Sequence, residues 1–366
     1  MGGEKTAAVP IGYARAFDSV DHGCIVEELL SFGVEKHLVA WIAGFLQECT
    51  AEVRVNSMLS EDVSLTCGVP QGSVLGPLLF IVAVDSLSKR LNCIPVLQHG
   101  FFADDLTIVC TSADLSEIQQ TIQQGLDCIT NWSAEYYMEV SAEKTEYTLF
   151  GAREMNLLSL KVVETALKEE RTPKLLGLTM QPHKGLSKHV VCVKAAANTR
   201  LLQLRAVAPP ERDQEREKLR AFCLALVQAN MCYGVASWWF DTSLSDRERL
   251  ERVQAQAAHI VAGIPKAANR EDALREARLK PPNEVAHRRA LEYYLQLKAK
   301  GPVHAKVADS IFPPEPPIHV RLAKVQRLYS TIDSPEKPHE ATALQWARCV
   351  HFNATMPGAL KAGAPE

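Results

Sequence analysis

The spacing of apolar residues in the first half of the chain switches between a strand pattern and a helix pattern. The stretch AAVPIGYA at 7–14 is apolar and partly β-branched, which predicts a strand, and helical spacing over 18–33 predicts a helix ended by Gly33. The same patterns predict two hairpins, at 51–69 and 101–110, and three amphipathic helices, at 37–47, 77–91 and 115–137. Hairpins that alternate with amphipathic helices predict an α+β fold, with an antiparallel sheet and helices packed on one face.

From about residue 185 the spacing of apolar residues is almost entirely helical. A helix predicted at 247–263 is stopped by Gly263 and Pro265, and another predicted at 283–300 ends at Gly301. Four prolines between 313 and 317 predict a stiff linker, and the chain beyond them has few residues that could form a hydrophobic core. The patterns therefore predict three parts, which are an α+β domain at 1–183, a helical region at 184–310 and a proline-broken tail at 311–366.

Length and composition limit the class of protein. The 366 residues are enough for two or three domains, and 47% hydrophobic with 23% charged residues is typical of a globular protein. The longest apolar run, at 74–84, is much shorter than the roughly 20 residues of a membrane span. The first residues lack a secretion signal, and the ten cysteines lack zinc-ligand spacing. We therefore expect an intracellular protein with reduced thiols and no membrane segment.

The net charge of −3 conceals a division along the chain. Residues 1–150 hold 7 basic and 20 acidic side chains, a net charge of −13, whereas residues 151–366 carry +10. An acidic first part and a basic second part favour carboxylate chemistry in the former and contact with a polyanion in the latter. Solvated helix faces are the other interpretation of the basic residues, and the charge count alone favours it.

Two segments carry candidate chemistry. Asp104 and Asp105 lie side by side between short apolar runs, where their repulsion is costly unless a cation such as Mg²⁺ balances it. The stretch CGVPQGSVLGPLLF at 67–80 has three glycines before a predicted helix, so its backbone can approach a ligand, and a helix N-terminus favours phosphate. Taken separately, the two segments are better explained as an exposed acidic turn and as an ordinary loop before a buried helix.

Four segments taken together resemble the palm motifs of reverse transcriptases. They occur in the family's order, as AFDSVDH at 16–22, GVPQGSVLGPLLF at 68–80, FADD at 102–105 and KLLGLT at 174–179. The similarity is to the non-LTR (LINE-type) retrotransposon class, in its jockey- and ingi-like branches, and covers roughly residues 5–300. Four motifs in order at workable spacing are far more specific than any one of them.

The resemblance implies a fold and a reaction. The fold would be a polymerase palm, followed by a helical thumb and a helical C-terminal region. The reaction would be RNA-directed DNA polymerisation by two-metal phosphoryl transfer, with Mg²⁺ or Mn²⁺ as cofactor. The partners would be an RNA template and a DNA primer, with no small-molecule cofactor and no membrane. A nuclear location is expected from the family, although the sequence has no clear nuclear-localisation signal.

The resemblance also assigns the metal site and the nucleotide contacts. Asp104 and Asp105 match the metal-binding pair of the palm. Phe17 matches the bulky residue that excludes a 2′-hydroxyl group from the incoming nucleotide. Gln71 and Gly72 match the loop that contacts that nucleotide and the template.

Two further matches are less specific. Lys144 resembles a lysine suited to phosphate contact, with a solvated lysine as the alternative. Leu176 and Gly177 resemble the primer-grip turn at the edge of the palm, with plain core packing as the alternative for Leu176.

The chain departs from the family at Gly12. The family has a metal-bridging aspartate at this position, six residues before Asp18, and glycine has no side chain to bind an ion. Asp18 lies about 20 Å further along an extended strand, far beyond any Mg²⁺ ligand distance. The tip at Asp104 and Asp105 should lie beside the strand that holds Gly12, and any ion there would be held weakly, if at all.

These observations leave two functions open. With fewer than a dozen residues before Gly12, we also expect the fingers subdomain to be largely missing, as in a truncated copy of a mobile element's reading frame. The first function is a partial LINE-type reverse transcriptase, catalytically impaired because Gly12 replaces the first palm aspartate and because the fingers are missing. The alternative is a non-catalytic, nucleic-acid-binding relic with the same fold.

Overall fold

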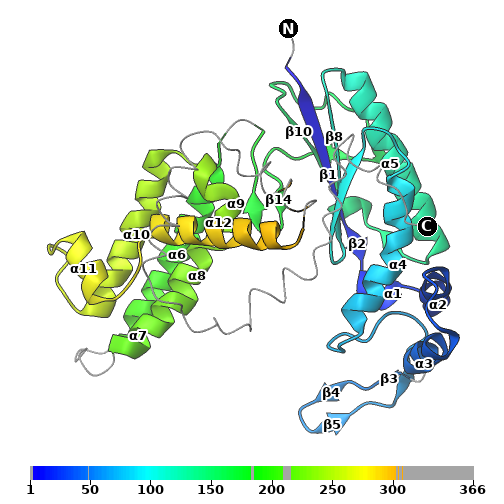
Figure 1. The fold of residues 1–366 in the computed structure, drawn as a ribbon, viewed down its shortest axis with the longest axis horizontal. Coiled ribbons are helices and arrows are strands. Elements are labelled where there is room, and N and C mark those ends of the chain that lie inside the picture. Colours follow the sequence, from blue (N-terminus) through cyan, green and yellow to red (C-terminus); the bar gives the residue numbers. More distant parts are fainter. Residues whose placement is uncertain are drawn as a thin grey trace. The chain divides into compact units, whose positions relative to one another are not determined.

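The computed structural model describes residues 3–47, 49–182, 185–208 and 216–301, together with 304 and 307. The tail predicted at 311–366 lies outside the described residues. The chain divides into two units between Thr172 and Pro173, each with its own hydrophobic core (Figure 1). This division lies about ten residues before the boundary predicted at 183, because the short hairpin at 174–179 belongs to the second unit.

The first unit is built on a five-stranded sheet in the order β13-β10-β1-β8-β7. The central strand β1 is antiparallel to both of its neighbours, and only β13 runs parallel to its partner, β10. The sheet strands are β1 (Lys5–Ile11), β7 (Gln98–Phe102), β8 (Asp105–Ser112), β10 (Glu146–Phe150) and β13 (Lys168–Glu169). The predicted α+β class is confirmed.

Alternate residues of β1 explain why this segment is a central strand. Ala7, Val9 and Ile11 are buried, and the residues between them are half-buried, so one face of the strand lies in the core. A proline is unusual in such a strand because it cannot donate to the ladder. Pro10 is tolerated because β10 pairs only with residues 6–8 of β1, so Pro10 has a neighbouring strand on one side alone.

Helices α4 and α5 pack beside the sheet and have the predicted amphipathic pattern. In α5 the buried positions recur at helical spacing, and the side chain of Asp114 caps its first turn. Gly125 of α5 lies directly against Ile108 of β8, where a Cβ on the glycine would come within 3.1 Å of the isoleucine side chain. The helices of this unit are α1 (Ala16–Ser19), α2 (His22–Ser31), α3 (Lys36–Gln47), α4 (Gly76–Leu91), α5 (Leu115–Glu135) and a 3₁₀ turn (Ala142–Lys144).

The single helix predicted over 18–33 is wrong, because the structure divides it into α1 and α2. Asp21 interrupts the helical conformation, and its carboxylate accepts a hydrogen bond from the backbone N–H of Cys24 at 3.0 Å. Asp21 also forms a backbone bridge to Cys67. The capping side chain and the bridge together satisfy backbone groups that a continuous helix would otherwise pair.

The hairpin predicted at 51–69 is present as a two-part arm. Strands β3 and β6 form its base and β4 and β5 its tip, which extends away from the five-stranded sheet (Figure 1). All the strand residues of this arm are exposed. The remaining strands of the unit are β2 (Tyr13–Ala14), β3 (Thr50–Ala51), β4 (Arg54–Val55), β5 (Met58–Leu59), β6 (Val63–Ser64), β9 (Glu139–Val140), β11 (Lys161–Val162) and β12 (Thr165–Ala166).

The described part of the second unit is helical apart from one short hairpin, as predicted. That hairpin consists of β14 (Lys174–Leu175) and β15 (Leu178–Thr179). The helices are α6 (Ser187–Val207), α7 (Arg216–Phe222), a π-helical segment (Cys223–Gln228), α8 (Ala229–Met231), α9 (Val235–Trp238), a 3₁₀ turn (Trp239–Asp241), α10 (Leu244–Ala262), α11 (Arg270–Glu276) and α12 (Pro282–Ala299).

One helical stretch of this unit, Arg216–Asp241, is long and apolar enough to cross a membrane by length and composition alone. Its side chains at Leu219, Cys223, Val227 and Met231 are buried in the core of the second unit. These four positions recur at helical spacing, so one face of the stretch packs into that core.

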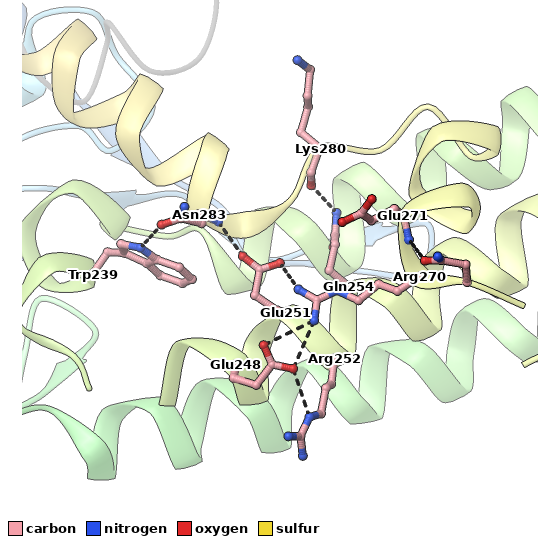
Figure 2. Close-up of polar contacts among 10 residues, drawn as sticks. Trp239, Glu248, Glu251, Arg252, Gln254, Arg270, Glu271, Lys280 and Asn283 are labelled. Carbon is pink, nitrogen blue, oxygen red and sulfur yellow. Dashed lines mark hydrogen bonds and ion pairs between the residues drawn. The ribbon is translucent and has the colours of Figure 1, made fainter. Parts of the chain in front are cut away.

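A partly buried polar network joins α10 to α11 and α12 (Figure 2). The guanidinium group of Arg270 donates to the carboxylates of Glu248 (3.1 Å) and Glu251 (2.9 Å). Glu251 also accepts the backbone N–H of Asn283, whose side-chain oxygen accepts from the indole of Trp239. Burial raises the pKa of Glu251. The hydrogen bond from the backbone N–H of Asn283 and the charge of Arg270 act in the opposite direction. Residues from three helices thereby share one set of hydrogen bonds.

Candidate active site

The end of β1 and the tip of the β7–β8 hairpin lie side by side. Ile11 of β1 pairs with Leu106 of β8, so Gly12 follows at the end of the ladder, next to the tip. Phe102 pairs with Asp105, which leaves Ala103 and Asp104 as the two residues of the turn. The sequence places the same three positions together, at Gly12, Asp104 and Asp105, and the register confirms that expectation.

The hairpin tip holds two neighbouring carboxylates. Ala103 has a positive φ of 54°, which turns the chain sharply enough to put Asp104 at the turn and Asp105 at the start of β8. Asp104 is half-buried and Asp105 is exposed. Partial desolvation, followed by the charge of Asp104, raises the pKa of the Asp105 carboxyl group. The folded chain therefore disfavours a second negative charge at the tip.

Gly12 is covered by the segment that carries Lys144. The backbone N–H of Ser141 donates to the carbonyl oxygen of Gly12 at 2.7 Å, and the N–H of Gly12 donates to the hydroxyl of Thr145 at 3.2 Å. A Cβ atom built on Gly12 would lie 2.5 Å from the Cβ of Lys144. The space that the first atom of an aspartate side chain would need at this position is therefore filled.

The residues present do not complete the two-metal centre that the family resemblance implies. Over the described residues, no group of three or more His, Cys, Asp and Glu side chains is arranged to hold a metal ion. Over these residues, neither Asp18 nor Asp21 joins the pair at Asp104 and Asp105. The pair offers two carboxylates, and the third position is a glycine.

The loop that precedes α4 docks onto α1 and the residue that caps α2. The backbone N–H of Gly68 donates to the carbonyl of Val20 at 2.8 Å, and the N–H of Val69 donates to that of Phe17 at 2.8 Å. The imidazole of His22 donates from Nε2 to the carbonyl of Gly68 at 2.6 Å. Two motifs that lie about fifty residues apart in the sequence thus form one surface.

Gly68 is required by this docking. Its φ is +83°, and a Cβ at this position would lie 2.7 Å from the Cα of Asp18. Gly72, in the same loop, also has a positive φ (86°), but no atom lies within 4 Å of its missing Cβ. The first glycine permits a close backbone approach, whereas the second serves only the conformation of the loop.

The predicted nucleotide contacts lie on this surface in part. Gln71 donates from its amide to the carboxylate of Asp18 at 2.7 Å, so its side chain is already held in place. Phe17 is half-buried, and its ring stacks on that of Phe80 with centroids 4.3 Å apart. The sequence did not predict that Asp18 accepts from Gln71 or that His22 donates to Gly68. The only available signal was their position in AFDSVDH, one of the four motifs.

The predicted primer-grip residues belong to the second unit. Leu176 has a positive φ (46°), and its carbonyl accepts a hydrogen bond from the hydroxyl of Tyr233 at 3.2 Å. The ring of the same tyrosine packs against Gly177, 3.0 Å from the position of its missing Cβ. The structure therefore groups these two residues with the helices of the second unit, and their role in gripping a primer stays a prediction.

Comparison with known proteins identifies what these sites resemble. Residues 3–180 match the sequence model of the family described as "Reverse transcriptase (RNA-dependent DNA polymerase)". The chain is 24% identical over 261 residues to the "RNA-directed DNA polymerase from mobile element jockey" of Drosophila melanogaster, covering 69% of this chain and 28% of that protein. It is 23% identical over 349 residues to the "Probable RNA-directed DNA polymerase from transposon BS" of the same species, covering 91% and 36%.

The chain therefore spans well under half the length of these relatives. Among solved structures, apo telomerase from Candida tropicalis is similar at a TM-score of 0.40 and 11% identity, over 95% of this chain and 54% of that one. A similarity this distant does not bear on function. The family match and the sequence relatives are what establish that residues 3–180 belong to the reverse transcriptase family, with homologues among the RNA-directed DNA polymerases of non-LTR retrotransposons.

Proposed function

We propose that residues 3–180 form the palm of a non-LTR retrotransposon reverse transcriptase whose catalytic step is disabled at Gly12. The observation that carries this proposal is the geometry at the end of β1. Gly12 lies beside the carboxylates of the hairpin tip, and the space of its missing side chain is filled by Lys144. A missing ligand and a closed space together distinguish this site from a functional site that merely lacks its ion.

The electrostatic consequence can be given as an order of magnitude. In two-metal phosphoryl transfer, charge gathers on the attacking and leaving oxygens, and the ions that balance this charge depend on their carboxylate ligands. A single preorganised electrostatic group is worth about 10²–10³ in rate, and a carboxylate at position 12 would be a group of that kind. We therefore expect nucleotide addition to fall below the detection limit of an ordinary extension assay.

Nucleic-acid binding does not depend on Gly12 and forms the second part of the proposal. The region expected to act as the thumb, at 184–310, lies in the basic part of the chain. We propose that it provides most of the contact to an RNA template paired with a DNA primer. Such contact is tolerant of sequence and weakens steeply with salt, because phosphate contacts release counterions.

Primer extension on a primed RNA template tests the catalytic proposal. The full chain is compared with Asp104→Ala in Mg²⁺ and in Mn²⁺, after binding of the primer–template has been verified for both proteins. We expect both to bind and neither to add nucleotides above background. Robust extension by the unmodified chain that is abolished by Asp104→Ala would overturn the proposal and identify a working polymerase.

A further inference from the structure

Helices α6 and α10 leave a hollow between them on the surface of the second unit. A cavity of about 390 Å³ is lined by residues of both helices, among them four basic side chains, Lys194, Arg205, Arg249 and Arg252. A second cavity of about 300 Å³ shares Arg205 and Gln256 with the first and continues to Lys266. We call the two cavities together the α6–α10 groove.

The groove is positively charged. No acidic residue lines either cavity. In the described part of the chain, neither Lys194 nor Arg205 forms an ion pair, so both charges are available to a ligand. Each of the two helices that form the groove therefore presents basic side chains to the same hollow.

The other two arginines of the lining each pair with an acidic residue that does not itself line the groove. Arg249 pairs with Asp246 at 3.0 Å, and that carboxylate is buried, where it also accepts the hydroxyl of Ser187. Arg252 donates to Glu248 at 3.3 Å, and the half-exposed Glu248 also accepts from Arg270, which pairs with Glu251 as well (Figure 2). Neither Asp246 nor Glu248 lines the two cavities, so the lining itself carries no negative charge.

The dimensions of the groove fit a chain of phosphates better than a single anion. Lys194 and Arg205 are eleven residues apart on α6, which corresponds to about 16 Å along the helix. The second cavity extends the basic lining beyond Arg205. A small anion would meet only one or two of these charges, whereas a polyanion could meet them all.

The floor of the groove indicates which polyanion it takes. Leu201 and Val253 lie at its base, and Leu202, with 63% of its surface exposed, stands at its edge. The bases of a duplex are paired and stacked inside the helix, so a duplex would offer this apolar floor only phosphates. The unpaired bases of a single strand can rotate toward the protein, enter a cavity and stack on apolar or guanidinium surfaces.

We propose that the α6–α10 groove binds single-stranded nucleic acid, with phosphates on the basic residues and bases over the apolar floor. This proposal rests on the proposed ability of the chain to bind nucleic acid, and it assigns a site and a strand state to that binding. It concerns only residues of the second unit, so it does not depend on whether the centre at Gly12 is active.

Three labelled probes test the groove in the full chain, namely an rU20 strand, a dT20 strand and a 20-base-pair RNA duplex. Binding is measured by fluorescence anisotropy between 50 and 200 mM KCl. Lys194→Ala and Arg205→Ala should each weaken rU20 binding about fivefold. Each should also reduce the slope of log K against log salt by about 0.7, the value for one contact to a single strand. Duplex binding should change much less.

Matched variants on the same helices separate the groove from general positive charge. Arg200→Ala removes a charge from α6 outside the groove and should leave both affinity and slope unchanged. Gln256→Glu adds a negative charge where the two cavities meet, at nearly constant volume, and should weaken rU20 binding. Gln203→Glu makes the same change on α6 away from the groove and should not. If the groove variants lose affinity for both rU20 and dT20, the proposal is supported and the groove does not distinguish the two sugars. If they lose affinity for rU20 alone, the proposal is supported and the groove recognises the ribose.

Other outcomes would overturn it. An equal loss in Arg200→Ala, or an equal loss of duplex binding, would refute the groove but leave the proposed nucleic-acid binding intact. Failure of the unmodified chain to bind any of the three probes would refute both.

Discussion

At Gly12 the missing Cβ allows the 3₁₀ turn that carries Lys144 to close over the end of β1. The carbonyl of Gly12 accepts a hydrogen bond from the N–H of Ser141, and its N–H donates to the hydroxyl of Thr145. Both backbone polar groups of the glycine therefore hold this contact. An aspartate at position 12 would therefore have to displace backbone as well as add a carboxylate. In the proposed account the absence of a carboxylate at position 12 and the packing of the turn are coupled, so Gly12→Asp alone should not restore the site.

The first prediction concerns this contact. Gly12→Ala and Gly12→Asp should both destabilise the end of the sheet by about 1–3 kcal/mol, because the added Cβ overlaps that of Lys144. Adding Lys144→Gly to Gly12→Asp should recover part of the loss. Hydrogen exchange of peptides covering β1 and β10 measures the local free energy of opening. Unchanged exchange in both single variants would show that the turn moves away at no cost.

The second prediction concerns the carboxylate pair at the hairpin tip. The folded-state pKa of Asp105 is raised by desolvation and by Asp104, so the ionised group destabilises the fold relative to the unfolded chain. The cost is absent below the unfolded pKa of about 3.9 and develops fully as pH rises through the folded value. Asp105→Asn should thus be more stable than the unmodified chain at pH 7, and the difference should vanish near pH 3.

The size of this effect is limited because Asp105 is exposed and its charge is screened. We expect a gain of less than about 1 kcal/mol at pH 7, measured by urea unfolding at a series of pH values. Asp104→Asn is the control. It removes the repulsion by Asp104 but leaves the desolvation of Asp105, so it should stabilise the fold less. A loss of stability at pH 7 in Asp105→Asn would mean that the ionised group has a favourable partner.

At the scale of elements, the loop at 67–72 and helix α1 behave as one assembly. Backbone hydrogen bonds join Gly68 to Val20 and Val69 to Phe17, and the side chains of His22 and Gln71 add one bond each. This assembly fixes the position of the helix that follows, α4, whose Phe80 stacks on Phe17. The loop is thus held by close backbone contacts, so few changes in its backbone conformation are tolerated.

The third prediction follows from the two glycines of this loop. Gly68→Ala should destabilise the docked loop by more than about 2 kcal/mol, because a positive φ and a backbone overlap with Asp18 add together. Gly72→Ala should cost only about 1 kcal/mol, from its φ alone. Hydrogen exchange over 67–80 compares them. Equal costs would show that the approach of Gly68 to Asp18 is not tight in solution.

Most elements follow from local sequence, and the exceptions have physical causes. The hairpin at 101–110 and helices α4 and α5 were predictable because their apolar periodicity and turn residues agree. The break between α1 and α2 was not, since it depends on the cap at Asp21 and its bridge to Cys67. The unit boundary also differs from the prediction, because the β14–β15 hairpin pairs locally and packs on Tyr233.

The candidate site was predictable only in its membership. Motifs place Asp104, Asp105 and Gly12, and the strand register brings them together as expected. The packing of Lys144 on Gly12 could not be inferred, because the two residues are 132 positions apart and no periodicity relates them. The bond between Gln71 and Asp18 is likewise a tertiary contact that no local pattern encodes.

At the scale of the whole molecule, the two units divide the proposed tasks. The first unit holds the altered carboxylate site, and the second holds the α6–α10 groove. The relatives are much longer, since this chain spans 28% of the jockey protein and 36% of the BS protein. Binding of an ion can be measured on this chain directly, because the residues proposed to govern it, Asp104, Asp105 and Gly12, all lie in the first unit.

Binding of Mn²⁺ to the full chain, followed by electron paramagnetic resonance, therefore tests the central claim most directly. The unmodified chain and Asp104→Ala should bind the ion with similarly weak affinity, because the third carboxylate is missing at Gly12. Gly12→Asp combined with Lys144→Gly should bind at least about tenfold more tightly, since loss of even an indirect partner of a metal site costs about 10–100-fold. The account would be contradicted if the unmodified chain bound Mn²⁺ as tightly as the double variant and lost that binding in Asp104→Ala.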